Sequence, residues 1–233
     1  MKKYNSVLAF GDSHVAGCEL TNGQELSQYL NGDITIEQAD APGKKLAFPQ
    51  LVAQELGVPC YNFAMTGGSN DRSIRLLAKA LQVHSDTLIL FGYTCTDRKE
   101  FYYPDEGNYL GRDKDKFIQV GMQWQGMIDS VVKNSTMTHP INDMFVDKML
   151  RPYNNLKELM FYVDAICTIY ALDFVHLPLF PENYLAVNKL FDFEGYGCYT
   201  KWCEAKQFKQ LPFLHYDQAA HKSLAKLIVK SLA

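Results

Sequence analysis

The sequence predicts an α/β protein: a three-layer α/β/α sandwich with a central, mostly parallel sheet and helices on both of its faces. A continuous apolar run at 7–10 and the mainly apolar segments 87–91 and 173–180 are typical of buried strands. Segments with helical spacing of apolar residues separate them. Each run also ends in a small or polar turn, and this alternation of strand and helix favours a parallel sheet.

The first half of the chain supplies two strands and one clear helix. Val7–Phe10 is the first strand, and the polar, Gly- and Asn-rich stretch 17–43 is expected to be a long excursion across the active-site end of the sheet. Phe48–Gly57 has apolar residues at helical spacing and a glycine stop, so it predicts an amphipathic helix. Val58–Ala64 is predicted to be a short second strand.

The next segments continue the alternation. The glycine turn 65–72 opens a predicted helix that extends to Leu81, and Thr87–Phe91 is the third strand. Leu156–Leu172 has few charges, so we expect a well-buried helix there. Asp173–Phe180 is predicted to be the fourth strand.

The remaining segments include two irregular regions and one helix. Residues 100–150 are interpreted as an insertion, either a cover over the substrate or plain decoration, and 181–210 as an irregular, aromatic-rich region. The final segment ends in a helix with residues 221, 224, 225, 228 and 232 on one face. No repeat or linker divides the chain, so we expect a single domain over 1–233.

Composition narrows the class of function. A formal net charge of -3, a pI near 6.1 and the lack of any basic block argue against nucleic-acid binding. No signal peptide or membrane span is predicted, so we expect a cytoplasmic protein, with a virion component as the alternative. The six cysteines are expected to be mainly buried free thiols, and their spacing gives no metal site. No cofactor is predicted, and the oligomeric state is left open.

The turn after the first strand carries the main functional signal. Gly11-Asp12-Ser13-His14 directly follows the buried run and precedes a predicted helix. In a parallel α/β sheet, ligands bind beyond the carboxyl ends of the strands, and backbone N–H groups at a helix start stabilise negative charge. Ser13 is therefore placed as a nucleophile would be. The alternative is that Asp-Ser is simply a turn and helix cap.

Four segments together resemble the SGNH (GDSL-like) hydrolases. They are Phe10–His14, Asn62–Gly67, Gly92-Tyr-Thr94, and His215 followed by His221. The resemblance implies the flavodoxin-like SGNH fold, Ser13 as nucleophile and His215 as general base. It also implies an oxyanion hole formed by the N–H groups of Ser13 and Gly67.

The chain departs from the family pattern at the third block. The asparagine of that block, an oxyanion donor, corresponds here to Thr94. Either the Thr94 hydroxyl takes over this role or another donor does, and Asn70 is the candidate substitute. The alternative for Asn70 is a turn or helix-cap residue.

A second departure concerns the orienting carboxylate. The family's aspartate lies three residues before the catalytic histidine, and Pro212 occupies that position here. Asp217 corresponds to the family's helix-capping serine, so we interpret it as structural. His221 is the competing base, but it shares a helix face with core residues. The resemblance therefore implies a Ser13–His215 dyad, with a backbone carbonyl as one candidate for holding the imidazole.

Other polar and aromatic residues have two interpretations each. Arg72, Arg75 and Arg98 are candidates to bind an anionic substrate group, although Arg98 with Glu100 would equally make a surface ion pair. His176 is expected to be packed and hydrogen-bonded within its strand, and Asp12 to organise its turn. Three aromatic side chains either stack against a sugar or are simply packed in the protein: Tyr102, Tyr103 and Tyr109.

These observations lead to two competing hypotheses from different classes. The first is an SGNH-type ester hydrolase that removes an acyl group, such as acetate, from a carbohydrate or another small ester. The second is a catalytically weak or inactive SGNH-like module that binds a glycan or a protein partner, for example in a viral particle. A nucleotide-binding domain is disfavoured because the first turn lacks a Gly-x-Gly-x-x-Gly loop and the chain has no Walker motif.

Overall fold

The computed structural model describes residues 3–21, 24–31, 33–95, 98–102, 117–120, 152–181 and 190–232. Its centre is a parallel sheet of four strands in the order β2-β1-β3-β6. The strand bounds are Ser6–Phe10 for β1, Cys60–Asn62 for β2, Thr87–Tyr93 for β3 and Asp173–Pro178 for β6. The predicted α/β class, the parallel sheet and its four strands are confirmed.

The strand order creates a switch point beside β1. The chain passes from β1 to β2 on one side and then crosses to β3 on the other, so Leu8 pairs with Tyr61 and with Ile89. Where the strand order reverses in this way, the carboxyl ends of neighbouring strands border the ligand-binding crevice of an α/β fold. The turns after β1 and β3 therefore meet at this edge of the sheet.

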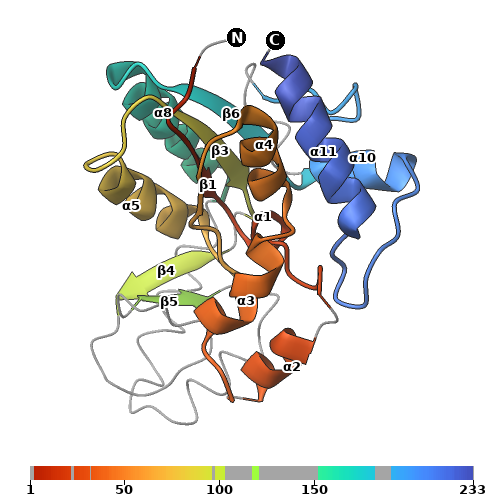
Figure 1. Ribbon diagram of the computed structural model, residues 1–233. Coiled ribbons are helices and arrows are strands. Elements are labelled where there is room, and N and C mark those ends of the chain that lie inside the picture. The colour runs from red at the N-terminus through yellow and green to blue at the C-terminus, as the bar shows by residue number, and fades with distance from the viewer. Residues whose placement is uncertain are drawn as a thin grey trace.

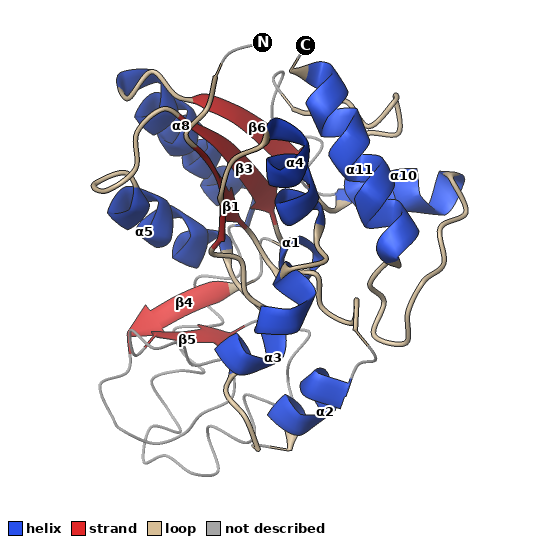
Figure 2. Cartoon of the chain, viewed as in Figure 1, coloured by secondary structure: helices blue, strands red, loops and turns tan. Residues whose placement is uncertain are grey.

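Helices cover both faces of the sheet, as Figures 1 and 2 show. Side chains alternate along each strand, so Val7 and Ala9 pack on one face while Leu8 and Phe10 pack on the other. The first face is covered by α4 (Phe48–Leu56), α10 (Tyr199–Ala205) and α11 (Gln218–Ser231), the second by α5 (Asn70–Ala80) and α8 (Pro152–Ile169).

The excursion at 17–43 contains helices that its composition concealed. The short helix α1 (Ser13–Ala16) is followed by α2 (Gln24–Leu30) and α3 (Ile36–Lys44). Thr35 and Gln38 form a capping box that starts α3, although Pro42 lies inside this helix. Polar residues and a proline thus masked helices that local capping and packing support.

Two further predictions need correction. The region 181–210 contains α10, and α8 is not buried all round, because Phe161, Tyr162 and Ile169 are largely exposed. A low number of charges predicted burial, but only one side of α8 faces the sheet. Of the predicted insertion, the structure describes β4 (Lys99–Tyr102) and β5 (Phe117–Val120), an antiparallel pair; the rest of 103–151 lies outside the described residues.

The six cysteines are free, and all but the half-buried Cys60 are buried. Among the described residues, no helix is both long and apolar enough to cross a membrane. The same part of the chain holds no group of three or more His, Cys, Asp or Glu that could bind a metal ion.

His221 links two helices across the first face of the sheet. Its side chain is 1% exposed, and Nδ1 accepts a hydrogen bond of 3.1 Å from the Phe48 N–H at the start of α4. Burial lowers the pKa of His221 from 6.5 to about 3, so the imidazole stays neutral in the folded protein. The prediction that His221 is a structural histidine is confirmed.

This burial predicts a measurable acid sensitivity. Between pH 7 and pH 5 the unfolded chain takes up a proton at His221 and the folded chain does not, which lowers the free energy of unfolding by about 2 kcal/mol. A His221→Asn variant should therefore lose about 2 kcal/mol less than the wild type over that interval, measured by chemical denaturation. His84→Asn is the matched control. Equal losses in the wild type and His221→Asn would contradict the assignment.

Candidate active site

The turn after β1 is built by Asp12. Its side chain accepts a hydrogen bond of 3.0 Å from the His14 N–H, which caps α1. Ser13 is the first residue of this helix and is 6% exposed. Within the described residues, no hydrogen bond engages the Ser13 hydroxyl or its N–H. The predicted role of Asp12 as the organiser of this turn is confirmed.

Glycines allow the first helix to lie against the strand ends. A Cβ atom at either Gly11 or Gly92 would lie 2.5 Å from Cγ2 of Val15. Gly11 also has a φ of +148°, a conformation that other residues rarely adopt. The glycines at the ends of β1 and β3 are therefore required for Val15, and with it α1, to approach the sheet closely.

A buried polar network joins the ends of β1 and β3. Asp12 Oδ2 accepts the Thr94 hydroxyl at 2.7 Å and Arg98 Nη1 at 2.9 Å, and Arg98 Nη1 also donates to Thr94 Oγ1 at 2.9 Å. Burial alone would raise the pKa of Asp12, but the Arg98 guanidinium and these hydrogen bonds hold it below its usual value. Asp12 is thus an anion that fixes two loops to each other.

This network changes the interpretation of two residues. Arg98 pairs with Asp12 inside the protein, so the surface ion pair of Arg98 with Glu100 is not formed. Glu100 is instead held by Arg75, whose Nη2 lies 2.7 Å from Oε2. Sequence separation suggested the wrong pairing because Asp12 is close to Arg98 only across the sheet.

Asn70 holds the turn after β3 from the opposite side. Its Oδ1 accepts the Thr94 N–H at 3.0 Å, and its Nδ2 donates to the Thr94 carbonyl at 3.1 Å. The helix cap of α5 is Ser69, not Asn70. An amide Nδ2 carries two hydrogens, so Asn70 has one more N–H to donate, whereas the only O–H of Thr94 is directed at Asp12.

Gly67 lies in a turn that Asp40 organises. Asp40 is 2% exposed and accepts both the N–H of Thr66 at 2.8 Å and its hydroxyl at 2.6 Å. Gly67 has a φ of +74°, and within the described residues its N–H has no acceptor. The turn therefore leaves the Gly67 N–H available for a ligand.

His215 is held by a carboxylate that the sequence did not reveal. Its Nδ1 lies 2.6 Å from Glu19 Oε2, and the Phe213 N–H donates to both oxygens of Glu19, at 3.0 and 3.1 Å. Burial would raise the pKa of Glu19, but these hydrogen bonds lower it, so the group is ionised. An ionised carboxylate only accepts hydrogen bonds, so Nδ1 of His215 is the donor to Glu19, and Nε2 is directed away from this contact.

Both partners of this contact lie in unusual backbone. Glu19 has a φ of +66°, and Leu214, directly before His215, has a φ of +70°. Such conformations are uncommon for residues other than glycine and concentrate at functional sites. No local signal marks Glu19 in the sequence, because the contact joins the segment after α1 to the loop before α11. The carboxylate thus reaches His215 from a position unrelated to Pro212.

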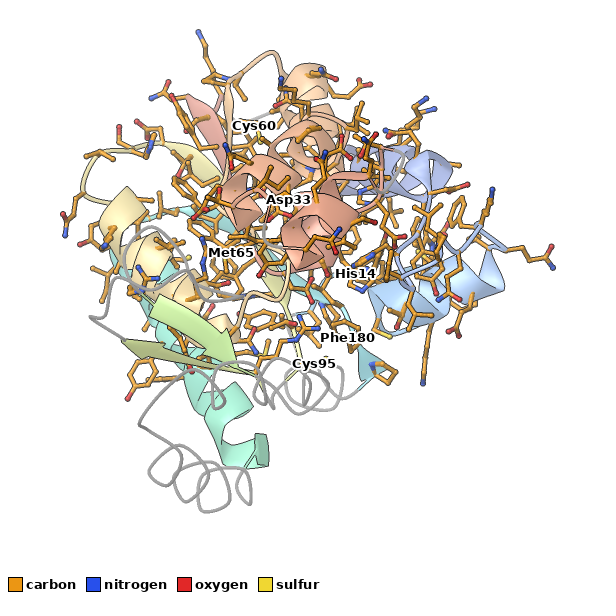
Figure 3. The ribbon with its side chains drawn as sticks, turned by 90° about the horizontal axis from the view of Figure 1, so that it is seen from below. His14, Asp33, Cys60, Met65, Cys95 and Phe180 are labelled. Carbon is orange, nitrogen blue, oxygen red and sulfur yellow. The ribbon has the colours of Figure 1, made fainter. Side chains whose placement is uncertain are left out.

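His14 places His215 near the nucleophile candidate. The ring centroids of His14 and His215 are 4.9 Å apart, and Ser13 directly precedes His14. The His14 ring also contacts Phe180 with ring centroids 5.2 Å apart, and both side chains are labelled in Figure 3. Burial lowers the pKa of His14 to about 4, so it is uncharged beside His215. Thus the tertiary structure brings His215 beside His14, the residue that follows Ser13.

Other residues singled out in the sequence have structural roles. Asp217 caps α11 by accepting the N–H groups of Ala219 and Ala220, as predicted. His176 lies inside β6 and contacts the Tyr93 hydroxyl at 2.7 Å, also as predicted. Arg72 donates to the Phe63 carbonyl at 2.6 Å.

The sugar-stacking alternative depends on three tyrosine side chains outside the described part of the protein. Tyr103 and Tyr109 lie outside the described residues, and so does the side chain of Tyr102.

No model of a protein family matches the chain, and a search of curated proteins also found no match. One solved structure is similar: a carbohydrate esterase, described as having an active site with divergent catalytic and non-catalytic binding functions. It matches with 14% identity and a TM-score of 0.44, over 100% of this chain and 69% of its own. A likeness of this degree assigns no activity.

The ionised Glu19 predicts a pH-dependent stability. Its folded pKa lies below the unfolded value, so it stabilises the protein above that value, and the stabilisation is lost as the pH falls through the folded pKa. Glu19→Gln should lower the free energy of unfolding at pH 7 by about 1–3 kcal/mol. The difference from the wild type should shrink below pH 4. Denaturation curves would measure it, with the exposed Glu55→Gln as control; a deficit that does not change with pH would contradict an ionised Glu19.

Proposed function

We propose that this protein is a serine hydrolase of the SGNH type, with Ser13 as nucleophile, His215 as general base and Glu19 as the residue that orients His215. The observation that carries the proposal is the 2.6 Å contact between Glu19 and His215 Nδ1. It fixes the tautomer in which Nε2 has a free lone pair, and this is the form that a nucleophilic serine requires.

The proposed reaction proceeds in two steps. The Ser13 oxygen attacks the ester carbonyl while His215 Nε2 takes the serine proton, and the resulting imidazolium gives that proton to the leaving alcohol. A water molecule then attacks the acyl-enzyme and loses its proton to His215, which returns the proton to the Ser13 oxygen as the acyl–serine bond breaks and the carboxylic acid leaves. The ionised Glu19 stabilises the imidazolium that forms in each step, as the buried aspartate does in serine proteases.

The oxyanion is expected to be held by three donors. The N–H groups of Ser13 and Gly67 have no acceptor within the described residues and are the first two. For the third, the structure favours Asn70 over Thr94, because the Thr94 hydroxyl already donates to Asp12. Asn70 keeps one Nδ2 hydrogen after its bond to the Thr94 carbonyl. Loss of such a donor typically slows the reaction by about 100- to 1,000-fold.

The proposed serine chemistry indicates a class of substrate. A serine activated by a histidine beside an oxyanion hole suits carboxylic esters, so we propose acyl esters such as acetate on a carbohydrate or another small alcohol. The rival proposal, a non-catalytic binding module, depended on the missing aspartate at Pro212 and on Thr94. Glu19 supplies a carboxylate to His215 and Asn70 a further amide donor, which weakens both arguments.

Covalent labelling tests the nucleophile. A fluorophosphonate probe should label the wild-type protein and fail to label Ser13→Ala, because only an activated serine attacks the phosphorus centre. Ser223→Ala, on α11, is the control and should label like the wild type. Labelling that persists in Ser13→Ala, or a folded wild-type protein that neither labels nor cleaves short acyl esters, would refute the proposal.

Steady-state kinetics test the role of Glu19. Glu19→Gln keeps a hydrogen-bonding side chain but removes the charge, so it should lower kcat by about 100- to 10,000-fold with little change in KM. Glu55→Gln should behave like the wild type. If Glu19→Gln kept kcat within about threefold of the wild type, the contact with His215 would be structural only.

A further inference from the structure

Arg98 has an unusual guanidinium group, because it is buried but only partly bonded. The residue is 7% exposed, and its Nη1 donates to Asp12 and to Thr94, at 2.9 Å each. Its Nε has almost no surface accessible to water and has no hydrogen-bond partner. Within the described residues the hydrogen bonds of Arg98 are made by Nη1, and Nη2 is not among the buried unpartnered atoms.

An unpaired charged donor of this kind is costly. Leaving a buried donor unsatisfied costs about 1–3 kcal/mol, and more for a charged group. Native structures therefore contain few such groups, and those that occur call for an explanation such as a ligand or a water molecule. At Arg98 the buried unpaired nitrogen is Nε, which forms one planar edge of the guanidinium with Nη2.

Arg75 shows in the same molecule what that edge binds. Its Nε and Nη2 donate to the two oxygens of Glu100, at 2.8 and 2.7 Å. This is the bidentate arrangement in which a guanidinium fork matches the two oxygens of a carboxylate. Arg98 offers the same pair of nitrogens without such a carboxylate.

The location of Arg98 connects this edge to the proposed reaction. Arg98 follows the end of β3, and its partner Asp12 directly precedes Ser13. The carboxyl ends of β1 and β3 are where an α/β fold binds its ligand. The Nε–Nη2 edge therefore belongs to the residue that, through Nη1, holds the turn in which Ser13 lies.

We propose that Arg98 is a specificity residue that binds a carboxylate on the substrate through Nε and Nη2. The substrate would then be an ester of an acidic molecule, such as an acylated sugar acid. This inference rests on the proposed function, since it takes the bound molecule to be the ester that Ser13 attacks. A singly charged carboxylate fits better than a phosphate, because Asp12 already balances most of the charge of Arg98.

A matched pair of esters tests this specificity. We would compare 3-acetoxybenzoate with 3-acetoxybenzamide, which carry the same acetyl ester and differ mainly in charge. The wild type should favour the acid in kcat/KM by about 10- to 100-fold, the range of a charge-assisted bidentate pair. Arg98→Lys keeps the positive charge for Asp12 but lacks the fork, so the acid-to-amide ratio should fall to near one. An unchanged ratio in Arg98→Lys, or no preference in the wild type, would overturn the proposal.

A binding measurement separates this proposal from the catalytic one. In Ser13→Ala, addition of benzoate should shift the NMR signal of the Arg98 Nε–H, whereas benzamide should not, and the signal of Arg75 should stay in place. A response to inorganic phosphate but not to benzoate would overturn the choice of a carboxylate. A benzoate response in a protein that shows no labelling and no ester cleavage would keep the Arg98 site and refute the hydrolase. No response to benzoate would refute the Arg98 site itself.

Discussion

The buried Asp12 carboxylate holds the candidate active site together. It accepts hydrogen bonds from the His14 N–H, the Thr94 hydroxyl and Arg98. Removing a carboxylate from water is costly unless its oxygens find such partners. The same three contacts cap α1, fix the turn after β3 to the turn after β1, and hold Ser13 at the start of its helix. One desolvated anion therefore determines the relative position of the loops from two strands.

The Glu19–His215 contact shows that a carboxylate far from a histidine in sequence can hold its imidazole. A carboxylate orients an imidazole through the Nδ1 hydrogen bond, and this effect depends on distance and ionisation state, not on the place of the carboxylate in the sequence. Glu19 comes from the segment after α1 and meets both His215 and the Phe213 N–H. The positive φ values at Glu19 and Leu214 indicate that backbone strain is tolerated to bring the two groups together.

Two buried neutral histidines lie near the Glu19–His215 contact. They are His14 and His221, and burial lowers the pKa of both well below 6.5. Among these three histidines only His215 has a carboxylate at hydrogen-bond distance. The protein thus combines three histidines near one another but provides a counter-ion for one. Burial and hydrogen bonding, and not residue type, separate the proposed base from the structural residues.

The sequence by itself determined the α/β class, the four strands of the parallel sheet, the terminal helix and the helix cap at Asp217, because these depend on local periodicity and capping. It also placed Ser13 at the carboxyl end of the first strand. The helices within 17–43 and 181–210 were missed, since their polar and aromatic composition lacks a clear period. Only the tertiary structure decided the partners of Asp12, His215 and Arg98. Those contacts join residues far apart in the chain, and such pairings are set by the packing of the sheet and its loops, not by spacing along the sequence.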